Sequence, residues 1–148
     1  MSLDLRSKFM VIVSIVLGIY AIIWGVAPYT SYNISARVLL DILDWPLDNM
    51  AAELDRNTKW LSAIGAGLLA AVAILLGGIV APAIKKGDAA VIRVAFWAIM
   101  AWYIIDGLGS MAVGITSNVI FNTFYLVLMI IPLVGINYET QHDVVENI

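Results

Sequence analysis

The stretch AFWAIMAWYIIDGLGSMAVGI, Ala95–Ile115, decides the fold, because Asp106 is its one charged residue. A run of about 20 apolar residues is what an α-helix needs to cross the hydrocarbon core of a bilayer. An ionised carboxylate near the centre of such a helix costs about 2.5 to 3.5 kcal/mol. It is retained where it faces other helices and is paired, hydrogen-bonded or protonated. Asp106 is therefore either a polar staple between helices or a binding or proton-responsive site.

The composition of the whole chain agrees with a membrane location. Of its 148 residues, 62% are hydrophobic and 13% are charged, and the mean hydropathy is +0.95. A soluble domain carries about 25% charged residues. The chain has no cysteine, which excludes disulfides, thiolate chemistry and cysteine-bound clusters. It has no basic face for a nucleic acid, so no nucleic-acid partner is expected. We predict an integral membrane protein whose surface is largely wetted by membrane lipid.

Three further apolar stretches are long enough to cross a membrane. The predicted spans cover about 9–27, 60–81, 91–113 and 117–136. No alternating strand pattern occurs, and a helix satisfies its own backbone hydrogen bonds in lipid. We therefore predict an all-α, four-transmembrane-helix bundle that forms a single membrane domain, with a tail at 137–148.

The long connection between the first two spans shows helical periodicity over about 34–55. Its polar residues recur at i, i+4, i+7 and i+11, and apolar residues fill the opposite arc. Such a pattern predicts an amphipathic helix lying in the membrane interface, which Pro46 interrupts before a second short turn. It is either a lid over the outer mouth of the bundle or a plain cover for helix ends. The predicted lid residues are Arg37, Asp41, Asp44, Asp48 and, at headgroup depth, Trp45.

Basic residues gather at one set of helix ends. Arg6, Lys8, Lys85, Lys86 and Arg93 fall on one side of the membrane, whereas the other side has Arg37, Arg56 and Lys59. The positive-inside rule therefore predicts that both termini are cytoplasmic.

The second span carries small residues at four-residue spacing, which allows helix backbones to approach closely. One stripe is Ser62, Ala66 and Ala70, and the next is Ala63, Gly67 and Ala71. These stripes predict close helix packing within the bundle, with a homodimer interface as the alternative.

Polar residues predicted at a similar depth surround Asp106. Asn118 and Asn122 share a face of the fourth span, and Tyr103 neighbours Asp106 on its own helix. Arg56 and Lys59, at the start of the second span, could extend inward toward the carboxylate. We therefore predict a ligand-binding cluster beneath the outer mouth, made of Asp106, Asn118, Asn122, Arg56, Lys59 and Tyr103. A structural staple is the alternative role.

Familiar membrane chemistries lack their residues in this sequence. His142, the single histidine, lies in the tail, so paired haem ligands are missing from the spans. Helical Glu-x-x-His pairs for a metal site are missing too, as are phosphate loops and nucleophile motifs. We expect no catalytic residue, no metal and no cofactor.

The stretches VLGIYAIIWGVAP and KWLSAIGAGLLA, followed by two more spans, resemble the small four-helix bacterial membrane proteins of the DoxX-like type. This resemblance implies a compact four-helix bundle in a bacterial inner membrane, and it transfers no catalytic residue.

Two classes of function fit these observations. The first is a non-catalytic accessory or assembly subunit that docks to a larger membrane complex or assembles as a homo-oligomer. The second is an autonomous binder or carrier of a small amphiphile, a lipid or quinone, that uses the polar site around Asp106. A carrier needs polar groups accessible from both sides, and the cytoplasmic half is almost wholly apolar. The sequence therefore favours the subunit.

Overall fold

The computed structural model describes residues 1–48 and 50–136, and within them it is helical without strands. The all-α prediction is therefore confirmed for this part of the chain. The predicted tail, 137–148, lies outside the described residues. The helices are α1 (Leu3–Val26), α2 (Asn33–Leu43), α3 (Arg56–Leu75), α4 (Ala81–Lys86), α5 (Ala89–Ala112) and α6 (Thr116–Ile130). A short 3-10 helix, η1 (Ala27–Tyr29), follows α1, and a π-helical segment, η2 (Leu76–Val80), joins α3 to α4.

Three helical segments are long and apolar enough to cross a membrane. They are Leu3–Tyr29, Arg56–Lys86 and Ala89–Ala112, of 27, 31 and 24 residues. Their length and composition support the prediction of a membrane protein. The second segment runs past the predicted end of its span at 81, because the helix continues through η2 and α4.

The fourth apolar helix is shorter than the predicted span over 117–136. α6 has 15 residues and ends at Ile130, before Pro132. Pro132 cannot donate a backbone hydrogen bond that would continue the helix, whereas Ile131 before it still has helical φ and ψ angles of −47° and −48°. Residues 131–136 continue as turns and bends, in which Leu133 and Ile136 are buried.

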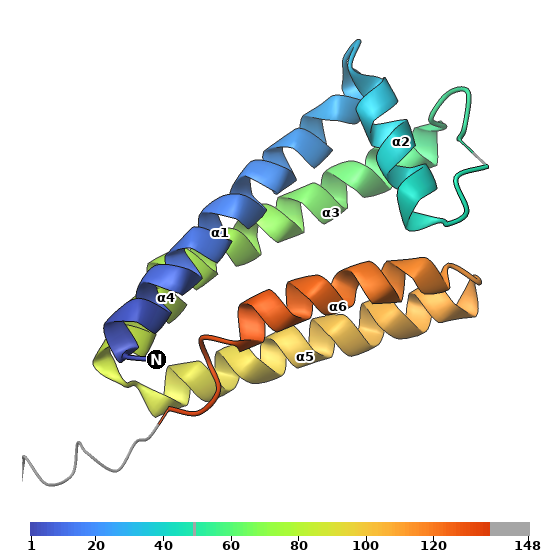
Figure 1. Cartoon of the computed structure of the whole chain (residues 1–148). Coiled ribbons are helices and arrows are strands. Elements are labelled where there is room, and N and C mark those ends of the chain that lie inside the picture. Colours follow the sequence, from blue (N-terminus) through green and yellow to red (C-terminus); the bar gives the residue numbers. More distant parts are fainter. Residues whose placement is uncertain (49, 137–148) are drawn as a thin grey trace, which may run out of the picture.

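The helices form two pairs (Figure 1). α1 packs along α3, and α5 packs along α6. The pairs lie close together at the α4 end and diverge toward the α2 end, where α2 extends from the first pair toward the start of α6. The stacked rings of Tyr20 and Tyr125, with centroids 6.1 Å apart, connect α1 to α6 between these ends.

The hydrophobic core is concentrated on the α4 side of the molecule. Both pairs, η2, α4 and the residues after α6 contribute to it. Its buried members include Met10, Leu17, Ile84, Ile99, Met129 and Leu133. A second, smaller cluster at the α2 end consists of Ala27, Ala36 and Leu54, with Leu40 packed against it. α5 and α6 contribute nothing to this smaller cluster, so the two pairs share their main core at one end.

Two serines of α1 hydrogen-bond to backbone carbonyls at either side of η2. Ser14 Oγ donates to Ala73 O at 2.7 Å, and Ser7 Oγ donates to Ala81 O at 2.7 Å. Serine hydroxyl groups are typical donors to backbone carbonyls of a neighbouring helix in membranes. The two bonds hold the α3–α4 segment against α1 on both sides of η2.

The connection between the first two spans is helical over a shorter range than predicted. α2 ends at Leu43, and residues 44–48 and 50–55 form turns, bends and irregular backbone. The predicted helical segment over 34–55, with its second turn after Pro46, is therefore wrong beyond Leu43. Pro46 explains the early end, because it disfavours helical backbone at Trp45 and supplies no N–H.

The basic residues of the α4 end include an exposed ion-pair network. Asp4 Oδ2 lies 2.7 Å from Lys8 Nζ, and Asp4 Oδ1 lies 3.7 Å from Lys85 Nζ. Gly87, at a φ of 69°, ends α4, and the carboxylate of Asp88 then accepts from the N–H groups of Ala90 and Val91. The tight turn between α4 and α5 lies at the same end of the molecule as the N-terminus of α1 (Figure 1).

Candidate functional site

The carboxylate of Asp106 is held by side chains of its own helix pair. Asn122 Nδ2 donates to Oδ2 at 2.7 Å, and Asn118 Nδ2 donates to Oδ1 at 3.2 Å. Ser110 Oγ also donates to Oδ1, at 3.3 Å. Asn118 Nδ2 and Ser110 Oγ are 2.8 Å apart, which joins two of the donors to each other. Within the described part of the chain, Asp106 is thus satisfied by neutral donors.

Helical spacing explains why these four residues meet. Asp106 and Ser110 are four residues apart on α5, as Asn118 and Asn122 are on α6, so each pair lies on one helix face. Asn122 and Ser110 are buried, and Asp106 and Asn118 are half-buried. The short turn after α5 reverses the chain and places the two polar faces against each other.

A further polar contact extends this interface. The hydroxyl groups of Tyr103 and Thr123 are 2.9 Å apart. The structure therefore brings together Asp106, Asn118 and Asn122 from the predicted cluster, and it places Tyr103 on the neighbouring turn. Ser110, one helical turn after Asp106, is a further member, and Thr123 is a member that the sequence analysis did not select.

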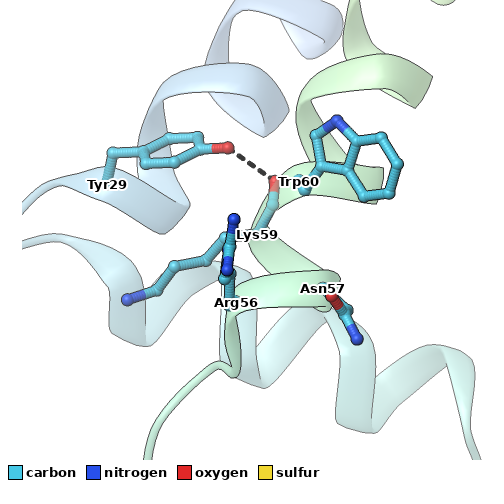
Figure 2. Close-up of a pocket in the computed structure, with 5 residues that line it drawn as sticks. All are labelled: Tyr29, Arg56, Asn57, Lys59 and Trp60. Carbon is cyan, nitrogen blue, oxygen red and sulfur yellow. Dashed lines mark hydrogen bonds between the residues drawn. The ribbon is translucent and has the colours of Figure 1, made fainter.

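Arg56 and Lys59 lie in a different place from Asp106. They line an open pocket of about 810 Å³ at the end of α1 and the start of α3, together with Tyr29, Asn57 and Trp60. Figure 2 shows the side chains of Arg56 and Lys59 below the rings of Tyr29 and Trp60 in this view. The Tyr29 hydroxyl donates to Lys59 O at 2.7 Å, which ties the end of α1 to the first turn of α3.

The start of α3 is capped by an exposed carboxylate next to this pocket. Asp55 Oδ1 accepts from the backbone N–H of Thr58 at 2.7 Å. That hydrogen bond lowers the pKa of Asp55, because the bond favours the ionised carboxylate. Asp55 is thereby engaged with the helix end.

Among the predicted lid residues, Arg37 forms hydrogen bonds with the connection between α2 and α3. The Arg37 guanidinium donates to the carbonyls of Ala51 and Ala52, and its Nε atom is buried without a partner in the described residues. A small pocket of about 80 Å³ lies beside it, lined by Arg37, Leu40, Asp41, Asp44, Ala51 and Leu54. Trp45 and Asp48 are exposed.

Ser117 connects the end of α2 to the start of α6. Its hydroxyl donates to Leu43 O, and it accepts from the backbone N–H of Trp45 at 3.2 Å. The sequence analysis did not identify this contact, because the two partners are far apart along the chain and belong to a loop and a helix start.

The two small-residue stripes of α3 have different surroundings. In the first, Ser62 and Ala66 are buried and Ala70 is half-buried; a Cβ atom added to Gly25 of α1 would lie 3.1 Å from Ala66 Cβ. In the second, Ala63 is half-buried, whereas Gly67 and Ala71 are exposed. The first stripe therefore packs against α1, and the second faces away from the rest of the chain.

Arg6 is a buried charged residue that the sequence analysis used only to count basic residues. Its guanidinium donates to five backbone carbonyls, of which four follow the end of α6: those of Ile131, Pro132, Val134 and Gly135, besides that of Met1. Carbonyls at a helix end lack intrahelical partners and attract cations. Arg6 thus binds the end of α6 to the start of α1.

No group of three or more metal-ligating side chains occurs within residues 1–48 and 50–136. His142 belongs to the tail, outside the described residues. Comparisons of the chain with family models, with curated proteins and with solved structures returned no match.

Proposed function

We propose that this chain is a small non-catalytic membrane protein that docks to a larger membrane complex as an accessory or assembly subunit. The observation that carries the proposal is the divergence of the two helix pairs toward the α2 end (Figure 1). A membrane helix of a partner would contact the faces of the two pairs that diverge there, because helices in lipid associate through packing and interhelical hydrogen bonds.

The face of α6 toward α1 supports this docking site. Tyr125 stacks on Tyr20 of α1, and Ser117 contacts the end of α2. Phe121 lies between them at four-residue spacing, on the same face of α6. It is half-buried, whereas Val127 on the opposite side of α6 is 48% exposed. Phe121 is therefore our choice of residue for contact with a partner helix.

The proposed membrane arrangement has four crossings. The helical part of α6 is about 22 Å long at 1.5 Å per residue, and the buried residues after it extend the fourth crossing. α2 lies in the interface as the cover. With the α4 end carrying Arg6, Lys8, Lys85, Lys86 and Arg93, both termini face the cytoplasm of a bacterial cell, in an inner-membrane protein of the DoxX-like type.

The test is native mass spectrometry of the protein after gentle extraction from its own membrane, combined with site-specific photo-crosslinking. We expect one partner protein at fixed stoichiometry, which a photo-reactive phenylalanine at position 121 crosslinks and the same group at 127 does not. A monomer without a protein partner contradicts the proposal. A homo-oligomer would mean that the partner is a second copy of the chain and not a larger complex.

The alternative function is a binder or carrier of a lipid or quinone centred on Asp106. It has less support, because the Asp106 oxygens already accept hydrogen bonds from Ser110, Asn118 and Asn122. The same experiment distinguishes it: a lone protomer that retains a small amphiphile, and loses it in Asp106→Asn, favours the carrier.

A further inference from the structure

The pocket between the end of α1 and the start of α3 contains the cations of Arg56 and Lys59. Within the described residues, neither forms an ion pair with a carboxylate. Arg37, the third basic residue of this end, donates to the carbonyls of Ala51 and Ala52 instead. Of the three basic residues of the α2 end, two therefore line this pocket.

The remaining residues of the pocket are suited to the membrane–water interface. Trp60 and Tyr29 are 61% and 56% exposed, and such amphipathic rings prefer the level of the lipid headgroups. Asn57 supplies amide donors at the rim. The nearby carboxylate of Asp55 accepts from Thr58 and does not line the pocket.

We propose that this pocket binds a phosphate group, supplied by the headgroup of an anionic phospholipid or by a free phosphate compound. A guanidinium presents a planar pair of N–H donors that match phosphate oxygens, and a lysine ammonium adds a compact charge. A volume of about 810 Å³ lies within the usual range for small-molecule sites. The proposal is independent of docking to a larger complex.

The fixed backbone of the pocket favours binding. The hydrogen bond from Tyr29 to Lys59 O holds α1 against the first turn of α3. This bond fixes the backbone that carries both cations and both rings. A site whose backbone is already ordered loses less conformational entropy when the ligand binds.

The test uses the full chain in nanodiscs that contain phosphatidylcholine with a minor fraction of phosphatidylglycerol. Native mass spectrometry measures which lipid remains bound when the disc is removed. We expect the wild type to retain phosphatidylglycerol in preference to phosphatidylcholine. The Arg56→Gln/Lys59→Gln double variant is expected to lower that preference about tenfold or more, which corresponds to about 1.4 kcal/mol.

Two matched variants separate the pocket from general charge and folding effects. Lys8→Gln/Arg93→Gln removes the same number of charges at the opposite end, and it should keep the preference. The exchange Arg56→Lys/Lys59→Arg keeps both charges in the pocket and should retain most of the preference. Equal retention of both lipids by the wild type, an unchanged preference in the double variant, or its equal loss in the opposite-end control overturns the proposal.

A second arm identifies the source of the phosphate group. Inorganic phosphate at millimolar concentration is added to the wild type before the disc is removed. Displacement of phosphatidylglycerol supports a site that also accepts free phosphate, and retention supports the lipid headgroup as the ligand.

Discussion

Asn122 Nδ2 donates a 2.7 Å hydrogen bond to Oδ2 of Asp106, and this bond joins α6 to α5. Asn118 and Ser110 donate to the other carboxylate oxygen, so three neutral side chains satisfy both oxygens. An intramembrane carboxylate is tolerated under this condition. The arrangement favours the role of a staple that fixes the register of the α5–α6 pair.

Replacing Asn122 by leucine should therefore destabilise the protein. The change leaves Asp106 Oδ2 without its donor in a partly buried interface, which costs about 1 to 3 kcal/mol or more for a charged acceptor. Reversible unfolding in mixed detergent micelles measures the loss. Thr123→Val, which removes the more exposed Tyr103–Thr123 contact, should cost less.

A double-mutant cycle checks that the effect passes through the carboxylate. In Asp106→Leu/Asn122→Leu, donor and acceptor are both gone, so the double variant should be more stable than the sum of the single losses implies. If the losses of unfolding free energy in the two single variants simply add up in the double variant, the role of Asp106 as a staple between α5 and α6 is contradicted.

Ser117→Ala should loosen α2 from α6. The hydroxyl holds Leu43 O and the N–H of Trp45, and losing one such hydrogen bond costs about 1 kcal/mol. Hydrogen exchange at the Trp45 amide is expected to become about fivefold faster. Ser35→Ala is the control, because Ser35 Oγ donates to Tyr32 O at the other end of α2. An unchanged rate at Trp45 in Ser117→Ala would show that other contacts hold α2.

The sequence predicted those features that depend on local patterns. Apolar length identified the three helical segments that are long and apolar enough to cross a membrane, and four-residue spacing placed Asn118 and Asn122 on one face toward Asp106. It did not predict that Arg56 and Lys59 line a separate pocket, because similar depth along two helices does not determine which helices pair. Pro46 and Pro82 show the same limit: α2 ends early before the first, whereas the helix continues past the second through η2 and α4.

Arg6→Gln should cost far more stability than Lys8→Gln. Arg6 is buried and donates to carbonyls on both sides of the α1–α6 junction, and charge-assisted hydrogen bonds contribute about 1.5 to 3 kcal/mol each. Lys8 forms an exposed ion pair with Asp4, a kind of contact that contributes at most about 1 kcal/mol. Unfolding midpoints of the two variants, which lose the same charge, test this difference. Similar midpoints would mean that the carbonyl cluster contributes little.

Acid should weaken the start of α3. The hydrogen bond from Thr58 lowers the pKa of Asp55 in the folded chain below its value in the unfolded chain. Its contribution is therefore full above the unfolded pKa, and it is lost as the pH falls through the lowered, folded pKa. NMR of the Thr58 amide should report fraying in that range for the wild type. Asp55→Asn keeps an acceptor that does not titrate, so the same signal should not respond to acid there.

Gly77 and Gly78 provide a neighbouring pair that tests how closely η2 packs on α1. A Cβ added to Gly77 would meet Ser14 Oγ and lie 3.2 Å from Ser14 Cβ, whereas a Cβ added to Gly78 would have no heavy atom within 4 Å. Ser14 Oγ is engaged with Ala73 O, so it cannot turn away without losing that hydrogen bond. Gly77→Ala should therefore destabilise the protein by about 1 to 3 kcal/mol.

Gly78→Ala should be neutral or slightly stabilising, because alanine favours helix over glycine. Unfolding measurements compare the stability of the two single variants directly. The double variant Ser14→Ala/Gly77→Ala tests whether the Ser14 hydroxyl causes the loss. The double variant removes the hydroxyl that the new methyl group would meet, so it should recover part of the loss caused by Gly77→Ala. If Gly77→Ala and Gly78→Ala have the same stability, α1 and η2 are not in close contact.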